Sequence, residues 1–282
     1  MDILDSIEAM QAWRRSLPND ARVGFAPTMG NLHAGHISLI DQATQESDRV
    51  VASIFVNPMQ FGANEDLEAY PRTMAADLEK LEAAGTAAVF TPTIDDIYPE
   101  GIDQHTAVEV PGLTDVLCGA SRAGHFKGVT TVVSKLFGAV RPDVAVFGAK
   151  DLQQVLVIKK MVRDLLLPTD IVTVPTMRET DGLAMSSRNG YLTPAERQLA
   201  PRFSQALADC AEAIENDHSA VEVSLNTARD ALTDHGFKID YLEARRTFDL
   251  SLATKVDEEI ALFGAVYLGK TRLIDNRVIS PS

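Results

Sequence analysis

The sequence predicts an α/β fold, in which a doubly wound parallel sheet is followed by a smaller α+β domain. Two observations support this prediction. Over residues 1–175, short and almost continuously apolar runs alternate with helical patterns, which is typical of buried parallel strands joined by helices. Beyond Pro175 the order changes, because two long helical patterns come before the strand-like runs. We therefore expect one domain over residues 1–175 and a second over residues 176–282.

The first domain is predicted to alternate strands and helices. Apolar runs predict strands at residues 23–26, 50–56, 87–91, 144–148 and 171–174, and helical periodicity predicts helices at residues 37–45, 73–84, 130–140 and 151–165. In a Rossmann-like sheet of this kind, ligands bind beyond the carboxyl ends of the strands. The polar loops PTMGNLHAGH, NPMQFG and GAKDLQQ follow three of these strands, so we expect them to meet at one edge.

The second domain is predicted to begin with helices and to end with strands. One helix is expected at residues 194–215, with Thr193 as its N-cap and Pro194 at its first position, and another at residues 220–235. Strands are expected at residues 239–243, 260–267 and 272–276, and the segment LGKT between the last two predicts a hairpin.

Composition narrows the class of protein. A net charge of −14 argues against a nucleic-acid partner, since such proteins usually carry a basic stripe. Cys118 and Cys210 are the only cysteines, too few for a disulfide framework, which favours a reducing compartment. The N-terminus does not resemble a signal peptide, and the sequence has no apolar run of about 18 residues that could cross a membrane. We expect a cytoplasmic protein with no nucleic-acid or membrane partner.

The segment HAGH, residues 33–36, places two histidines three residues apart where a strand gives way to a helix. A zinc site, a hydrogen-bonded histidine pair and an anion site are all open interpretations. Zinc would need further ligands, and no HExxH or paired Cys/His set accompanies the motif. A glycine-bearing loop at a helix N-terminus offers backbone N–H groups and a positive dipole end, which suit an anion. Histidine side chains can add hydrogen bonds to phosphate oxygens.

A second motif, MSSRN at residues 185–189, strengthens the anion interpretation. Taken alone, this segment is more typical of an ordinary polar turn than of a phosphate-binding loop. HAGH, however, resembles the HxGH motif of the nucleotidyltransferase superfamily, which includes class I aminoacyl-tRNA synthetases, and MSSRN resembles the KMSKS-type loop of the same superfamily. Such a loop brings hydroxyl groups and a guanidinium to a triphosphate.

Six segments occur in order and together resemble the pantothenate synthetase family, the ligases that join pantoate to β-alanine with ATP. They are PTMGNLHAGHISLI, SIFVNPMQFG, YPRT, GASRAGHFKGVTTVVSKLF, FGAKDLQQ and MRETDGLAMSSRNGYL. The resemblance covers most of residues 20–195. Two departures are Ala123, where the family often has proline, and Ala149, where it often has glutamate; neither removes a charged group expected in catalysis.

The resemblance implies a two-step reaction. The pantoate carboxylate attacks the α-phosphorus of ATP, and the β-alanine amine then attacks the acyl carbon of pantoyl adenylate. It also implies a homodimer and Mg²⁺, with Asp77 as a metal partner, although a solvated aspartate on a helix face is an alternative for Asp77. The implied catalytic residues are His33, His36, Lys150 and Arg188, with His36 as the acid/base residue. For Lys150 the alternative is a surface lysine. Asp151, the next residue, is either a nucleotide contact or the cap of the following helix.

The resemblance further implies binding residues. For ATP they are Met29, Gly30, Asn31, Leu32, His33, Ala34, Gly35, His36, Gly148, Ala149, Lys150, Asp151, Met177, Met185, Ser186, Ser187 and Arg188. For pantoate and β-alanine they are Pro27, Thr28, Met29, Gln60 and Gln154, with Tyr70 and Arg122 at the border. Met29 and Phe61 are either an apolar wall for the pantoate methyl groups or plain core residues. Residues 60–72 and the MSSRN loop are expected to exclude water from the reactive adenylate.

Two other functions share part of this pattern. A plain nucleotidyltransferase also carries HxGH, but it would form a dinucleotide-like product and need no amine. A nucleotide-binding module without activity is disfavoured because every motif of an active enzyme is present. A tRNA synthetase is disfavoured by the short length and by the charge of −14.

Overall fold

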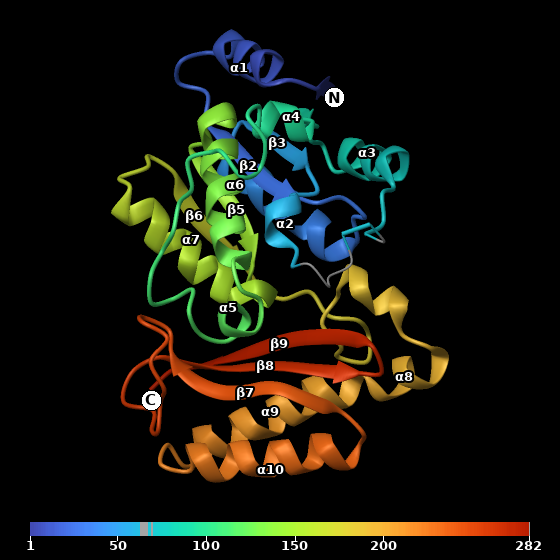
Figure 1. The fold of residues 1–282 in the computed structure, drawn as a ribbon, viewed down its shortest axis with the longest axis vertical. Coiled ribbons are helices and arrows are strands. Elements are labelled where there is room, and N and C mark those ends of the chain that lie inside the picture. Colours follow the sequence, from blue (N-terminus) through green and yellow to red (C-terminus); the bar gives the residue numbers. More distant parts are fainter. Residues whose placement is uncertain (63–66, 69, 282) are drawn as a thin grey trace. The chain divides into compact units, whose positions relative to one another are not determined.

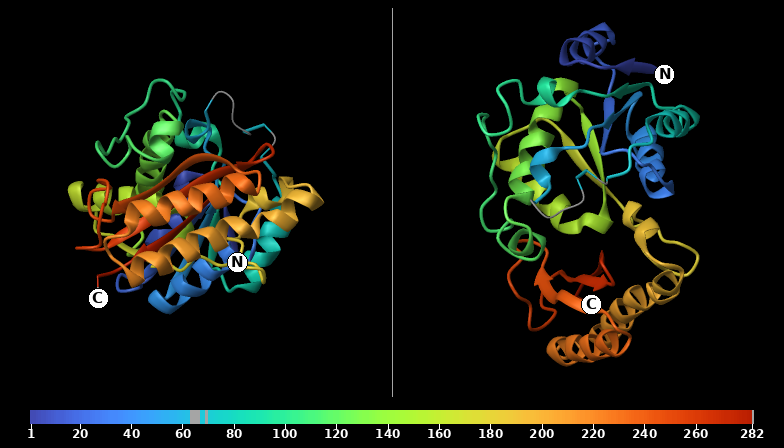
Figure 2. Two further views of the ribbon diagram at one scale, coloured as in Figure 1. Left: turned by 90° about the horizontal axis from the view of Figure 1, so that it is seen from below. Right: turned by 45° about the vertical axis from the view of Figure 1, so that its right-hand side comes forward.

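The structure is a computed structural model that describes residues 1–62, 67–68 and 70–281 (Figures 1 and 2). The chain divides into two compact units. The first unit comprises Met1–Thr114, Cys118–Ala149 and Gln153–Pro175, and the second comprises Asp115–Leu117, Lys150–Leu152 and the residues from Thr176 on.

The first unit contains a six-stranded sheet with the order β1-β4-β3-β2-β5-β6. Every neighbouring pair of strands in it is parallel, which confirms the predicted fold class. The strands are β1 (Asp2–Leu4), β2 (Val23–Thr28), β3 (Arg49–Ile54), β4 (Ala88–Phe90), β5 (Val144–Gly148) and β6 (Asp170–Val174).

Helices lie on both faces of this sheet, with α2 (Ala34–Glu46) and α3 (Met74–Ala83) on one face and α6 (His125–Val140) on the other. The other helices are α1 (Ile7–Ser16), α4 (Ile94–Ile97), α5 (Cys118–Ser121) and α7 (Leu152–Asp164). Ala26 of β2 shares a buried cluster with Leu39 of α2 and Leu81 of α3. The next residue back, Phe25, points to the opposite face because strand side chains alternate, and its ring meets Phe137 of α6 at 6.3 Å.

The strand order places the starts of three predicted loops at one edge. β3, β2 and β5 are neighbours in the sheet and run in the same direction. Their carboxyl ends therefore lie side by side, and the short 3-10 turns η1 (Pro58–Gln60) and η2 (Ala149–Asp151) follow β3 and β5. The expected meeting of these chain segments at the carboxyl edge is a consequence of the topology.

The second unit is built on an antiparallel sheet, β7-β8-β9, with strands β7 (Lys238–Arg246), β8 (Ile260–Leu268) and β9 (Thr271–Ile279). Its helices are α8 (Pro194–Leu199), α9 (Pro201–Asn216) and α10 (Val221–Asp234), and η3 (Ser187–Tyr191) is a 3-10 turn. Phe203 and Leu207 of α9 share one core with Leu262 and Val266 of β8. A Cβ on Gly264 would lie 2.8 Å from the Phe203 ring, so glycine lets α9 approach β8 closely.

The helix predicted at residues 194–215 is wrong as a single element, because α8 ends at Leu199 and α9 starts at Pro201. Proline has no N–H, and its ring clashes with the preceding turn, so a new helix begins there. The predicted cap is confirmed: Glu196 N donates to Thr193 Oγ1 at 3.3 Å, and Thr193 N donates to Glu196 Oε2 at 2.8 Å. The LGKT hairpin is also confirmed, since Leu268 pairs with Thr271.

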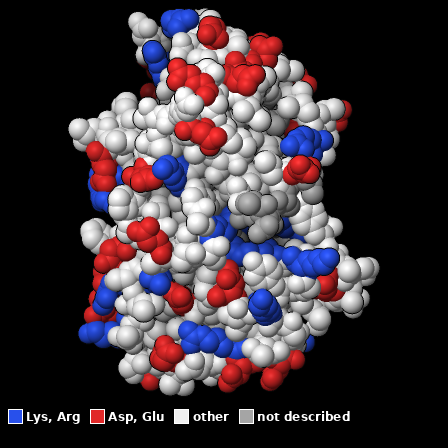
Figure 3. All heavy atoms as spheres, viewed as in Figure 1, with Lys and Arg blue, Asp and Glu red and all other residues white. Residues whose placement is uncertain are grey.

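Side chains of both charges lie on the face drawn in Figure 3, where blue Lys and Arg side chains gather near the middle of the view. None of the helices in the described part of the chain combines the length and the apolar character needed to cross a bilayer.

Candidate functional site

Asp77 of α3 holds the loop that follows β2. Gly30 and Asn31 both have positive φ, +81° and +51°, so the chain turns sharply here. Asn31 N donates to Asp77 Oδ2 and Leu32 N donates to Asp77 Oδ1, both at 2.8 Å. The Thr73 hydroxyl adds a third hydrogen bond to Oδ2 at 3.0 Å. Since backbone donors in a tight turn need acceptors, this carboxylate stabilises the turn.

These contacts do not fit a magnesium ligand. Mg²⁺ usually keeps several waters and binds proteins through one or two carboxylates, whereas Asp77 is 0% exposed. Nor is Asp77 a solvated residue on a helix face, so that alternative is wrong. The described residues contain no group of three or more His, Cys, Asp or Glu that could hold a metal ion. The assignment of Asp77 to magnesium stays a prediction, and one that these contacts do not support.

His33 and His36 form a capping box at the start of α2. Gly35 N donates to His33 Nδ1 at 3.1 Å, and His33 N donates to His36 Nδ1 at 3.3 Å. The two ring centroids lie 4.1 Å apart. An Nδ1 that accepts a hydrogen bond carries no proton, so the proton of each neutral ring is on Nε2. Both rings are thus N–H donors at a helix N-terminus, where the dipole favours anions.

Asn57 organises the turn that carries Gln60. It is 1% exposed, accepts a hydrogen bond from the Tyr98 hydroxyl at 2.8 Å, and donates to Gly128 O at 3.1 Å and to Gln60 Oε1 at 3.3 Å. Burial raises the pKa of Tyr98 to about 12, so this phenol remains a donor at neutral pH. Asn57 therefore links η1 to α6 and to Tyr98.

The loops after β2 and β3 meet through Met29 and Gln60. Gln60 Nε2 lies 2.7 Å from Met29 Sδ, and Arg122 Nη2 donates to the Gln60 carbonyl at 3.2 Å. Thr28 Oγ1 accepts from Gly30 N at 3.2 Å and donates to Ser53 O at 2.7 Å. The structure thus brings together predicted substrate and nucleotide residues within the first unit.

Other predicted residues of this unit lie in β2, in α7 and in the segment that follows η1. Pro27 is half-buried in β2, and Gln154 is half-buried in the first turn of α7. The rings of Phe61 and Tyr70 make an edge contact at 5.8 Å. Of the predicted cover at residues 60–72, residues 63–66 and 69 lie outside the described part of the chain.

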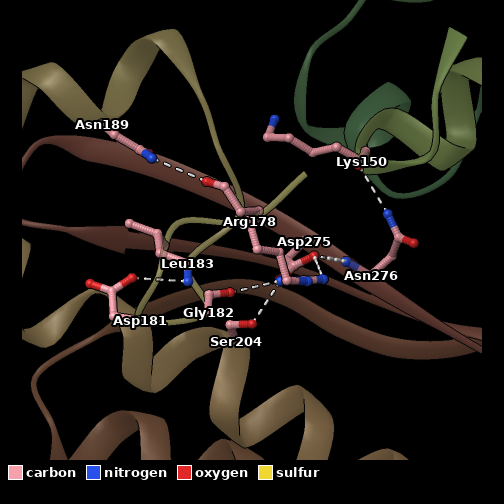
Figure 4. Close-up of polar contacts among 10 residues, drawn as sticks. Lys150, Arg178, Asp181, Gly182, Leu183, Asn189, Ser204, Asp275 and Asn276 are labelled. Carbon is pink, nitrogen blue, oxygen red and sulfur yellow. Dashed lines mark hydrogen bonds and ion pairs between the residues drawn. The ribbon is translucent and has the colours of Figure 1, made fainter. Parts of the chain in front are cut away.

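Lys150 belongs to the second unit. It lies in η2, directly after Gly148 ends β5. Its ammonium is 3.9 Å from Asp151 Oδ2, and its backbone carbonyl accepts a hydrogen bond from Asn276 Nδ2 at 2.9 Å (Figure 4). A strand of the second unit therefore fixes the backbone of the predicted phosphate-binding lysine.

The MSSRN motif follows a short hairpin. Met185 N donates to Met177 O at 3.0 Å, and Arg178 forms an antiparallel bridge with Ala184. Beyond the hairpin, Ser186 caps η3, because its Oγ accepts from Arg188 N at 3.3 Å. Hydrogen bonds at the hairpin and at η3 therefore hold the two ends of the segment Met185 to Arg188, which is predicted to contact ATP.

Comparison with known proteins assigns the family. The family model described as Pantoate-beta-alanine ligase matches residues 2–278. The chain belongs to the pantoate–β-alanine ligase family. Its relatives include the pantothenate synthetase of Shewanella amazonensis, 56% identical over 279 residues that cover 99% of this chain and 98% of that protein. The pantothenate synthetase of Hahella chejuensis is 55% identical over 265 residues, 94% of each protein.

Solved structures agree with this assignment. The crystal structure of pantothenate synthetase from Thermus thermophilus matches with a TM-score of 0.93 and 42% identity over 100% of both chains. That of the pantoate–β-alanine ligase from Francisella tularensis, complexed with β,γ-ATP and β-alanine, matches with a TM-score of 0.82 and 37% identity over 100% of both chains. This chain is accordingly an ATP-dependent ligase of pantoate and β-alanine.

In this ligase several organising residues escaped the sequence analysis. Asn57 is the first residue of NPMQFG, a motif from which only Gln60 and Phe61 were selected. Arg178 lies in the quoted segment MRETDGLAMSSRN. Asp275 and Asn276 interrupt the apolar alternation of the last strand, which is a detectable signal, but their partners are about a hundred residues away in sequence.

Proposed function

We propose that this ligase condenses its substrates through pantoyl adenylate. A pantoate carboxylate oxygen bonds to the α-phosphorus of ATP, and the bond to pyrophosphate breaks. The neutral amine of β-alanine then bonds to the acyl carbon, and the bond to the AMP oxygen breaks. AMP leaves and the amine loses a proton. Family membership and the two predicted phosphate-binding motifs support this route.

One observation carries the proposal: the capping box in which both imidazoles direct Nδ1 to the backbone. The first step brings a carboxylate to a polyanion, and two unit charges about 4 Å apart repel by roughly 4 kcal/mol at an effective dielectric constant of about 20. Nε2–H donors of His33 and His36, held rigidly at the N-terminus of α2, offset this repulsion without reorganising during the reaction.

We assign Lys150 and Arg188 to the same phosphates, with Met29 to His36, Gly148 to Asp151, Met177 and Met185 to Ser187 as the other nucleotide contacts. Gln60 and Gln154 suit the pantoate hydroxyl and carboxylate groups, because an amide can donate and accept without adding charge. Pro27, Thr28 and Met29 complete the acid-binding set. The contact between Met29 and Gln60 supports a shared acid pocket.

Further components follow the family resemblance. We propose that ATP reacts as its magnesium complex, with the ion held chiefly by phosphate oxygens and water, since that is how Mg²⁺ usually binds at nucleotide sites. We also propose a homodimer in the cytoplasm. Both cysteines are buried thiols rather than halves of a disulfide, which agrees with a reducing compartment.

The test replaces His36 and Lys150 by alanine and measures AMP formation with pantoate, β-alanine and Mg-ATP. Each variant is expected to lose at least about a hundredfold in kcat, as is typical when one donor to a transition-state charge is removed. Matched controls are His235→Ala and Lys159→Ala, which change exposed residues and should retain the wild-type rate. Rates within about twofold of wild type for either test variant would remove that residue from its role.

Substrate dependence separates the ligase from a plain nucleotidyltransferase. In multiple turnover, AMP and pyrophosphate should appear together only when pantoate, β-alanine and ATP are all present. Pyrophosphate release that ignores pantoate, or a product that retains the AMP moiety, would contradict the proposed reaction.

A further inference from the structure

Two adjacent residues of β9, Asp275 and Asn276, connect segments that are far apart in sequence (Figure 4). Successive side chains of a strand point to opposite faces. Asp275 pairs in register with Gly264 of β8, the residue that packs against Phe203 of α9, so Asp275 faces the helices. Asn276 faces the other side of the sheet. One dipeptide therefore reaches both faces of the strand.

On the helix face, Asp275 holds Arg178 with two parallel hydrogen bonds. Arg178 Nη1 lies 2.7 Å from Asp275 Oδ2, and Nη2 lies 3.0 Å from Oδ1. The Asp275 side chain is 1% exposed. Arg178 Nη1 also donates to Ser204 Oγ at 2.7 Å. A bidentate pair of this kind fixes the orientation of both groups, because each is planar.

Arg178 in turn fixes the segment that leads into the MSSRN motif. Its Nη1 donates to Gly182 O at 3.0 Å, across the hairpin whose strands are bridged at Arg178 and Ala184. At the far end, Asn189 Nδ2 donates to Ala184 O at 3.1 Å. The residues between Ala184 and Asn189 include Ser186, Ser187 and Arg188. The charge pair thus anchors the base of the loop that carries them.

On the opposite face, Asn276 Nδ2 donates to the Lys150 carbonyl at 2.9 Å. Asn276 is 8% exposed, and its backbone N–H donates to Asp275 Oδ1 at 2.8 Å. The Asp275 carboxylate is therefore common to both branches: it binds Arg178 directly, and it orients the residue that binds Lys150.

We propose that Asp275 and Asn276 are positioning residues for the ligation. From one strand, Asn276 holds the Lys150 backbone and Asp275, through Arg178, holds the base of the Ser186–Arg188 loop. This proposal rests on the proposed phosphate-binding roles of Lys150 and Arg188. In this proposal, neither Asp275 nor Asn276 contacts the reacting atoms. Each acts by fixing the place from which a cationic side chain extends, and small displacements of such a group have large effects on rate.

The first test is a double-mutant cycle between Asn276→Ala and Lys150→Ala. We expect Asn276→Ala to lower kcat by about tenfold or more, while the KM for β-alanine changes less than about threefold. In a Lys150→Ala background, the second substitution should cost less than about twofold, since the side chain that it positions is gone. Equal losses in both backgrounds would show a general structural effect and overturn the proposal.

The second test addresses the other branch with Asp275→Asn and Arg178→Lys. The lysine variant keeps the charge and loses the parallel hydrogen bonds, so kcat should fall in both variants. The matched control is Asp240→Asn, because Asp240 pairs at 2.7 Å with Arg272 of β9, the strand of Asp275, and has no described link to Lys150 or the MSSRN loop. Asp240→Asn should keep the wild-type kcat; a loss equal to that of Arg178→Lys would overturn the proposal.

The outcomes also separate this inference from the proposed function. A Lys150→Ala enzyme with the wild-type rate contradicts the phosphate role itself. A Lys150→Ala enzyme that has lost activity beside an Asn276→Ala enzyme of wild-type kcat leaves that role intact and overturns only the positioning role. Thermal unfolding of every variant identifies any that fail to fold, and Asn276→Ala removes only one side-chain amide.

Discussion

Asp77 and His33 hold the middle and the end of the loop that follows β2. Asp77 accepts from the backbone of Asn31 and Leu32, and His33 caps the helix that starts at Ala34. The histidine spacing is visible in the sequence, and so is a helix start after the loop. The role of Asp77 is not, because its partners lie 45 and 46 residues away and the pairing depends on how α3 packs.

Asp77→Asn tests the loop role against the metal role. Asparagine keeps one carbonyl oxygen and replaces the other with an NH2 group, so one buried backbone N–H loses its acceptor, at a cost of about 1–3 kcal/mol. We expect a lower unfolding midpoint in urea and a kcat/KM that falls by about tenfold or more, with an unchanged Mg²⁺ concentration at half-maximal rate. Glu79→Gln, an exposed change on the same helix, is the control.

A different outcome would restore the metal assignment. If Asp77→Asn unfolds at the wild-type urea concentration but needs about tenfold more Mg²⁺ for half-maximal rate, the carboxylate binds the ion during the reaction.

Strands that consist of a continuous apolar run were predictable from the sequence. Elements whose position depends on pairing with a distant strand, or on a turn at their start, were predicted less well. The strand predicted at residues 144–148 is β5 with the same bounds. By contrast, β1 has only three residues and pairs with β4, far along the chain, so no local pattern marks it. Helix α6 starts at His125 rather than at residue 130, because Gly124 turns the chain there with φ +80°.

Close packing between α6 and η1 leads to a prediction for Gly128. A Cβ at this position would lie 2.5 Å from Met59 O and 2.8 Å from Gln60 N, so Gly128→Ala must displace the turn that carries Gln60. We expect a loss of about 1–3 kcal/mol in the free energy of unfolding, as overpacking usually costs. The KM for pantoate should rise by about tenfold or more, measured by steady-state kinetics.

The same helix supplies the control. Gly138 is exposed, and a Cβ there would meet nothing within 4 Å. Gly138→Ala should stabilise the protein by about 0.5–1 kcal/mol, because alanine loses less backbone entropy in a helix, and should leave the pantoate KM unchanged. Equal KM values for the two variants would contradict the proposed link between α6 packing and acid binding.

The order of strands in the sheet explains which parts of the site could be predicted from the sequence. Parallel strands in the order β3-β2-β5 put the ends of three strands at one edge, so the motif-bearing segments after β2 and β3 were correctly expected to meet. The contribution of the second unit to the site was not predicted, because it depends on side-chain contacts made by β9. The roles of Asp275 and Asn276 follow from their contacts with Arg178 and Lys150, which are distant in sequence.

The overall charge of −14 acts at the scale of the whole molecule. Every substrate in the proposed reaction carries a carboxylate or phosphates, so the general field of the protein does not attract them. Binding must depend on local donors, and the proposed site supplies them as imidazoles, a helix N-terminus, Lys150 and Arg188. A local cationic site can exist within an acidic protein because nearby charges dominate the potential.

The carboxylate oxygens of pantoate report on whether ligation passes through an acyl adenylate. Pantoate labelled with ¹⁸O in its carboxylate is incubated with β-alanine, Mg-ATP and the enzyme, and the products are analysed by mass spectrometry. We expect one labelled oxygen in AMP for each pantothenate formed, because the amine displaces AMP at the acyl carbon and the bridging oxygen stays with the phosphate. Unlabelled AMP, or label in inorganic phosphate together with ADP, would contradict the acyl-adenylate route.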